Sequence, residues 1–139
     1  MVLQITVQAI VKAPLVQVWS AYVSADDIVQ WNAASDDWHT TRAEVDLRVG
    51  GAFVYRMEAK DGSSGFDFAG TYRVVEPERV LAYDFFGRSA RVEFADGHDG
   101  VTVSVTFEAE TENPIEMQQE GWQAILTRFK HHVEADSQE

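Results

Sequence analysis

The chain contains 139 residues, 45% of them hydrophobic and 24% charged, which is the size and balance of one globular domain. Lys and Arg number 11 and Asp and Glu number 23, so the formal net charge is −12, and this charge argues against nucleic acid as a partner. The chain contains no cysteine, which excludes disulfides, thiolate nucleophiles and cysteine-ligated metals.

The N-terminal segment alternates apolar and polar residues over 3–11, which predicts a half-buried strand. It has neither the basic start nor the long apolar run of a signal peptide. No apolar run approaches the roughly 18 residues that a membrane span needs. We therefore expect a cytoplasmic protein without a membrane span.

Two short helices are predicted next. Pro14 suits the first turn of a helix, and the apolar residues that follow it recur with helical spacing. Ser24, with Asp27 three positions later, has the form of a capping box for a second helix that continues to Trp31. Because each helix is too short to be stable alone, we expect both to pack on a sheet.

From Trp38 to Phe107 the apolar residues recur at every second position, which predicts about six further strands. Turn-forming segments at 50–51, 60–65 and 96–100 separate them. The short connections favour an antiparallel meander, and a sheet of about seven strands twists and curls. Curling leaves a concave face that another element has to cover.

The last predicted element is a long amphipathic helix from about Asn113 to Val133. Asn113 is a favourable N-cap, Pro114 fits the first turn, and Glu116 has the acidic position of a capping box. The broad apolar stripe of this helix consists of Ile115, Trp122, Ile125, Leu126, Phe129 and Val133. We expect the helix to cross the concave face and to leave a small-molecule cavity beneath it.

The aromatic residues are abundant, at 8 Phe, 4 Tyr and 4 Trp, and most of them should fill the core. A strongly curved sheet closed by one helix is difficult to fill, so aromatic residues at inward positions are candidates for the wall of an apolar site. The candidate ligand-binding residues are Trp31, Trp38, Phe53, Tyr55, Met57, Phe68, Tyr72, Tyr83, Phe85, Phe94, Met117, Gly121, Trp122 and Ile125.

Gly121 lies in the middle of the last helix, where glycine costs about 1 kcal/mol relative to alanine. Three explanations are open: close approach of the helix to an underlying strand, space for Trp122 of the same turn, or close approach of the backbone to a ligand. We favour the two structural explanations.

The sequence contains no convincing catalytic constellation, so no catalytic residue is predicted. His39 has the chemistry of a general base near the cavity mouth, but a partly exposed strand histidine explains it better. Asp84 alternates with Tyr83 and Phe85, which places it on the outer face of the sheet. The histidines lack metal-ligand spacing, and no phosphate loop or dinucleotide fingerprint occurs, so neither a metal nor a cofactor is predicted.

Four blocks of the sequence carry a family resemblance: 13–19 with Trp31, 45–53, 70–79 and 118–126. Together and in this order they resemble the START-like helix-grip superfamily, the SRPBCC group. Within it, the chain resembles small bacterial proteins related to the C-terminal domain of the activator of the ninety-kilodalton heat-shock protein's ATPase. The resemblance implies an α+β fold for a single domain over 1–139. In it, a curved antiparallel sheet of about seven strands wraps around a long C-terminal helix, with two short helices after the first strand.

Relatives in this superfamily bind or transport hydrophobic molecules, and some are polyketide cyclases or aromatases. The resemblance therefore implies that a small hydrophobic or aromatic ligand binds in the cavity. An enzyme of the cyclase, dehydratase or hydrolase type is one alternative, with His39, Tyr55, Tyr83 or Arg128 as its polar groups. A chaperone-associated stress protein without a ligand is another, although the chain lacks the additional N-terminal domain of the eukaryotic co-chaperone. A homodimer is also compatible with the sequence.

Overall fold

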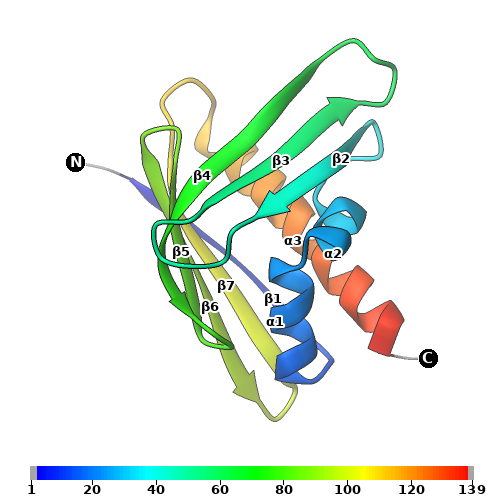
Figure 1. The fold of residues 1–139 in the computed structure, drawn as a ribbon, viewed down its shortest axis with the longest axis vertical. Helices are drawn as coiled ribbons and strands as arrows, with labels where there is room; N and C mark the ends of the chain where they lie inside the picture. Colours follow the sequence, from blue (N-terminus) through cyan, green and yellow to red (C-terminus); the bar gives the residue numbers. More distant parts are fainter. Residues whose placement is uncertain (1–2, 138–139) are drawn as a thin grey trace.

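The structure is a computed structural model that describes residues 3–137. A curled seven-stranded sheet and three helices make up the fold (Figure 1). The elements in chain order are β1 (Gln4–Val11), α1 (Leu15–Val23), α2 (Ala25–Trp31), β2 (Trp38–Val45), β3 (Ala52–Ala59), β4 (Gly65–Glu76), β5 (Val80–Phe85), β6 (Arg88–Gly97), β7 (Gly100–Glu108) and α3 (Ile115–Ser137). The predicted order of one strand, two short helices, six strands and one long helix is confirmed.

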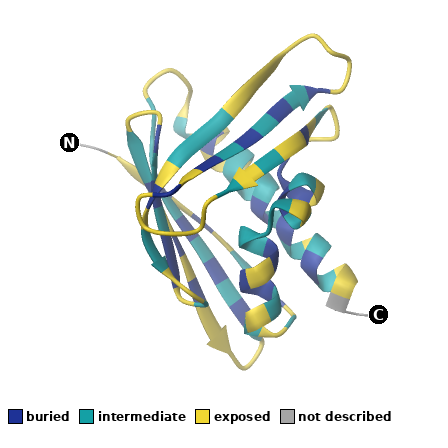
Figure 2. Cartoon of the chain, in the orientation of Figure 1, coloured by how far each residue is buried: buried dark blue, intermediate teal, exposed yellow. Residues whose placement is uncertain are grey.

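The strand order β1-β7-β6-β5-β4-β3-β2 combines a meander from β2 to β7 with β1 paired to β7. Every neighbouring pair is antiparallel, as the short connections predict. In the β1–β7 pair, Ile5 lies opposite Phe107 and Val7 opposite Val105, and all four side chains are buried. Buried and less buried residues alternate along these strands (Figure 2), so the core lies on one face of the sheet.

Helices cover both edges of the sheet. Along the edge strand β1, the Lys130 ammonium group of α3 donates to the Ile10 carbonyl at 2.8 Å. At the opposite edge, the Thr40 hydroxyl of β2 donates to the carbonyl of Asn32, just after α2, at 2.6 Å. The Ile10 carbonyl, a backbone group at the edge of the sheet, thereby finds a partner within the chain.

The helices α2 and α3 also contact each other, so the helical layer extends from one sheet edge to the other. The rings of Trp31 and Phe129 pack edge to face with their centroids 5.0 Å apart. His132 Nε2 lies 2.8 Å from Asp27 Oδ1. The helices therefore cover the concave face of the sheet in part, and this face is not open to solvent along its whole length. In the described part of the chain, no helix has the length and apolar character needed to cross a bilayer.

Two predicted helix caps are wrong. The α2 helix follows Ser24, but the Ser24 side chain makes no capping hydrogen bond. The α3 helix begins at Ile115, and the Asn113 side-chain amide donates to Glu110 at 3.1 Å instead of capping the helix. Gln118 secures this segment, since its side chain accepts the Glu110 amide and donates to the carbonyls of Glu110 and Asn113. The helix also continues beyond its predicted end, to residue 137.

Candidate functional site

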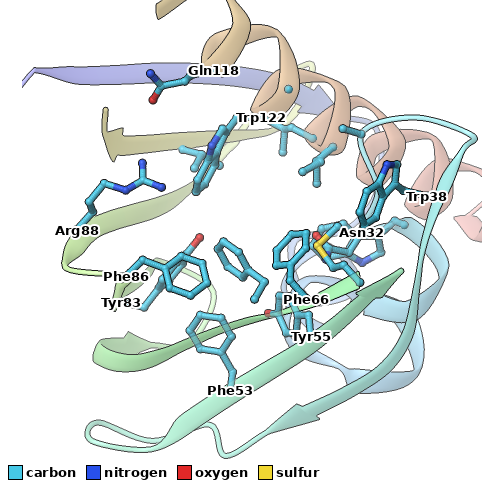
Figure 3. A pocket seen from close by; sticks show the side chains of 18 of the residues that line it. Asn32, Trp38, Phe53, Tyr55, Phe66, Tyr83, Phe86, Arg88, Gln118 and Trp122 are labelled. Atoms are coloured by element: carbon cyan, nitrogen blue, oxygen red, sulfur yellow. The ribbon is translucent and has the colours of Figure 1, made fainter. Parts of the chain in front are cut away.

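A pocket of about 470 Å³ lies between β3, β4 and β5 of the curled sheet and the N-terminal half of α3. Figure 3 shows Trp122 of α3 on one side of it and Phe53 and Tyr55 of β3 on the other. A volume of this size falls within the range of roughly 300–1,000 Å³ that small-molecule sites occupy. This pocket therefore offers space for a small ligand.

Most of the predicted ligand-binding residues lie in the wall of this pocket. Those that do are Trp31, Trp38, Phe53, Tyr55, Met57, Phe68, Tyr72, Tyr83, Met117, Gly121, Trp122 and Ile125. Phe85 and Phe94 do not line it, because Phe85 packs against Trp122 at 5.6 Å between ring centroids and Phe94 packs against Trp19 at 5.3 Å. Ligand contact by the residues of the wall stays a prediction.

Sequence reasoning misses the remaining residues of the wall: Tyr22, Asn32, Ala34, Phe66, Leu81, Phe86, Arg88, Val105, Asn113, Gln118 and Leu126. A signal for Arg88 exists in the sequence. A two-residue turn places Arg88 directly opposite Phe85, and residues directly opposite each other in an antiparallel pair share a face. No comparable signal identifies Tyr22, which reaches the pocket from α1.

All four tyrosines of the chain, Tyr22, Tyr55, Tyr72 and Tyr83, line the pocket. Burial raises the pKa of Tyr72 to about 12. It also raises the pKa of each of the other three tyrosines above the ordinary value of 10.0. At neutral pH these phenols are therefore uncharged. They can donate and accept hydrogen bonds, but they cannot act as phenolate bases.

The Tyr72 hydroxyl is buried and has no hydrogen-bond partner within the described structure. The Tyr55 hydroxyl approaches closely enough to affect the pKa of Tyr72, but the two make no hydrogen bond of normal geometry. An unpaired buried hydroxyl costs about 1–3 kcal/mol. The ring of Phe53, 5.2 Å away between centroids, holds the Tyr72 ring in place, so the unsatisfied group is fixed.

The mouth of the pocket is apolar. Phe66 of β4, Phe86 of the β5–β6 turn and Met117 of α3 line the pocket and are nevertheless 43%, 61% and 57% exposed. Phe86 has a φ of 47° and the following Gly87 a φ of 78°, which is the pattern of a type I′ turn. Because that turn favours Asn at its first central position, an aromatic residue there is strained. The strained turn presents the Phe86 ring to the pocket (Figure 3).

Gly121 has open space where a side chain would begin. Apart from its chain neighbours and its own helix backbone, no heavy atom lies within 4 Å of the position a Cβ would take. The predicted close approach of α3 to a strand is therefore wrong, and space for Trp122 of the same turn stays a prediction. Since Gly121 lines the pocket, the missing side chain enlarges it.

The described wall of the pocket contains no histidine, lysine, aspartate or glutamate, the side chains that usually exchange protons in catalysis. His39 is exposed and Arg128 pairs with Asp36, and neither lines the pocket. Asp84 lies on the outer face of the sheet, as predicted, where it pairs with Arg73 at 2.6 Å. The enzymatic alternative therefore retains only Tyr55 and Tyr83 of its predicted polar groups inside the pocket.

Among residues 3–137, one cluster of metal-ligand type lies outside the pocket, where ligand atoms of Asp27, His132 and Asp136 are within 4.8 Å of one another. His132 already makes a 2.8 Å contact with Asp27 and lies 3.9 Å from Asp136. These contacts join α3 to α2, so the pairing of the two helices explains the cluster.

Comparison with known families identifies a match over residues 12–134, to the family described as Activator of Hsp90 ATPase homolog 1-like protein. A comparison of the chain with curated proteins finds no match.

Solved structures extend this result. The chain is similar to the solution NMR structure of an AHSA1-like protein from Aeromonas hydrophila, with 46% identity, a TM-score of 0.93, and coverage of 99% of this chain and 96% of that one. It is also similar to a solution structure from Cytophaga hutchinsonii, with 40% identity, a TM-score of 0.82, and coverage of 96% and 93%. A crystal structure of protein NE0264 from Nitrosomonas europaea shares the fold at 19% identity, a TM-score of 0.85 and 96% coverage of both chains.

Proposed function

Because the chain belongs to the family of Activator of Hsp90 ATPase homolog 1-like proteins, we propose that it binds a small, mostly apolar or aromatic molecule in the pocket between the sheet and α3. The fold is the START-like helix-grip fold of the SRPBCC type, which typically binds hydrophobic ligands.

The observation that carries the proposal is an aromatic pocket that is open inside. Protein interiors are normally packed about as densely as organic crystals. Here a pocket of about 470 Å³ remains among aromatic side chains. A ligand with a mostly apolar body would fill this volume.

The walls of the pocket are preorganised for such a ligand. The Trp122 ring stacks on Phe107 with centroids 4.0 Å apart and planes inclined by 10°. The Trp31 indole nitrogen donates to the Ala21 carbonyl at 3.0 Å. Side chains fixed in this way lose little conformational entropy when a ligand binds, which favours affinity.

The chemistry of the wall supports binding over catalysis. The tyrosines are neutral at physiological pH, and the described wall offers no carboxylate, imidazole or amine as a general base. A cyclase or dehydratase function has no further support in the pocket. A homodimer and a chaperone partner stay predictions.

Calorimetric titration with naphthalene-2-carboxamide, a neutral two-ring aromatic, tests the proposal. We expect saturable binding with one site per chain. Gly121→Phe places a ring in the pocket, because the space beside Gly121 is open, and should weaken binding at least about tenfold. Gln119→Phe is the matched control, since it adds the same ring to an exposed position of α3 and should leave the affinity unchanged.

Equal affinity of wild type and Gly121→Phe would place the binding site elsewhere. Absence of saturable binding by naphthalene-2-carboxamide, by its one-ring and three-ring analogues and by the corresponding carboxylates would contradict the proposed function.

A further inference from the structure

We propose that the ligand of this pocket is an acid, whose carboxylate pairs with Arg88 while its apolar body lies among the aromatic side chains. This inference rests on the proposed function and specifies the chemical class of the ligand.

Arg88 is the first residue of β6 and lies in the wall of the pocket. Figure 3 shows it beside Trp122 at one end, away from Asn32 and Trp38 at the other. Its guanidinium lies 4.5 Å from the centroid of the Phe85 ring, which orients the side chain. The position follows from the tight turn before β6, which puts Arg88 on the inward face.

The hydrogen bonding of Arg88 leaves donors for a ligand. One terminal nitrogen donates to the Glu108 backbone carbonyl at 2.7 Å. The Glu108 carboxylate does not pair with Arg88, because it accepts from the amide and the hydroxyl of Ser89 at 2.6 and 2.7 Å. A guanidinium carries five N–H donors in a fork that matches a carboxylate.

The lack of a carboxylate partner sets Arg88 apart from most other arginines. Six of the eight arginines pair with Asp or Glu side chains in the described structure: Arg48, Arg56, Arg73, Arg79, Arg91 and Arg128. In a chain with a net charge of −12, carboxylates are plentiful. The arginine that lines the pocket is nevertheless without one among residues 3–137, and this arrangement leaves its charge for a ligand.

The surroundings favour an anion at this end of the pocket. No aspartate or glutamate belongs to the described wall, and the carboxylates of Glu108 and Glu110 beside it are already hydrogen-bonded to Ser89 and Asn113. Gln118 and Asn113, at the start of α3, line the same pocket with uncharged polar side chains.

The test compares acids with their neutral amides, which have nearly the same shape. Benzoate, naphthalene-2-carboxylate and anthracene-2-carboxylate, each with its carboxamide, are titrated calorimetrically at pH 7. We expect the best-fitting acid to bind at least about tenfold more tightly than its amide, as a charge-assisted pair in a partly buried site allows. Arg88→Gln should abolish this preference and leave the affinity for the amide within about twofold of wild type.

Two further variants make the test specific. Arg91→Gln removes an arginine of the same strand that already pairs with Glu93, and it should preserve the preference for acids. Arg88→Lys keeps the positive charge but lacks the planar guanidinium, so it should retain part of the preference for the acid over its amide. This variant keeps the test decisive if Arg88→Gln folds poorly.

The possible outcomes are distinguishable. If the amides bind and the acids bind no more tightly, the carboxylate inference is wrong and the proposed function stands. If Arg88→Gln weakens acid and amide equally, Arg88 shapes the pocket without pairing with an anion, and the inference is also wrong. If no acid and no amide binds, the proposed function itself fails.

Discussion

Gly121→Ala is expected to stabilise the protein, and this result depends directly on the open space beneath α3. Alanine is favoured over glycine in a helix interior by about 1 kcal/mol. The added methyl group meets no heavy atom within 4 Å outside the local helix and chain neighbours, so no steric cost offsets this gain. We therefore expect the free energy of unfolding to rise by about 1 kcal/mol, which for a domain of this size corresponds to roughly 3–5 °C in Tm.

Urea unfolding followed by far-ultraviolet circular dichroism measures this change. Gly70→Ala is the control, because a Cβ there would lie 2.6 Å from Phe53 Cε2 and would also clash with the Asp84 carbonyl. It should destabilise the protein by about 1–3 kcal/mol. If Gly121→Ala were destabilising as well, α3 would lie close to the sheet at Gly121, and the reasoning about the pocket would be refuted.

Phe86→Asn should raise the free energy of unfolding by about 1 kcal/mol, because Asn relieves the positive φ, and should weaken binding of naphthalene-2-carboxamide, because the ring at the mouth is lost. Absorbance at 295 nm should show no phenolate in the folded protein at pH 10, since all four tyrosines have raised pKa values. Raised values mean that the folded state holds these protons more tightly, so stability should fall as the pH rises above 10. Glu134→Gln should reduce the loss of stability below pH 4.5. Burial alone would raise the pKa of Glu134, but hydrogen bonds from Lys130 and from the Lys12 amide lower it overall.

Each of these predictions has a contradicting result. Phe86→Ala keeps the positive φ and removes the ring, so a gain in stability from it equal to that of Phe86→Asn would refute the strain argument. A phenolate signal that saturates near pH 10 in folded protein would show that the tyrosines are not buried. Unchanged acid sensitivity in Glu134→Gln would show that the pKa of Glu134 is not lowered by folding.

The fold could be predicted because its patterns are local and agree with one another. The alternation over Val101, Val103, Val105 and Phe107 predicts a strand with one buried face, and these four residues are buried. Helical spacing after Asn113 likewise predicts α3. The caps could not be predicted as well, because the Glu110 carboxylate, which precedes the helix, accepts both the backbone and the side-chain amide of Asn113.

The pocket wall could be predicted where the alternation of a strand or the apolar stripe of a helix decides which way a side chain points. Tyr55 and Tyr72 follow the alternation of their strands and line the pocket. Phe94 follows the same alternation but lies at the end of the sheet covered by α1, and parity carries no information on position along a strand. Phe86 reaches the pocket because of a strained turn. The alternation of apolar and polar residues along a strand does not encode the direction of a side chain in a turn.

The most direct test of the central claim is a set of intermolecular nuclear Overhauser effects between naphthalene-2-carboxamide and the protein. If the molecule enters the space between the sheet and α3, its ring protons should show effects to the side chains of Tyr55 and Trp122, which line the pocket from opposite sides (Figure 3). Effects confined to exposed residues outside the pocket, such as Val16 and Val49, would contradict the account.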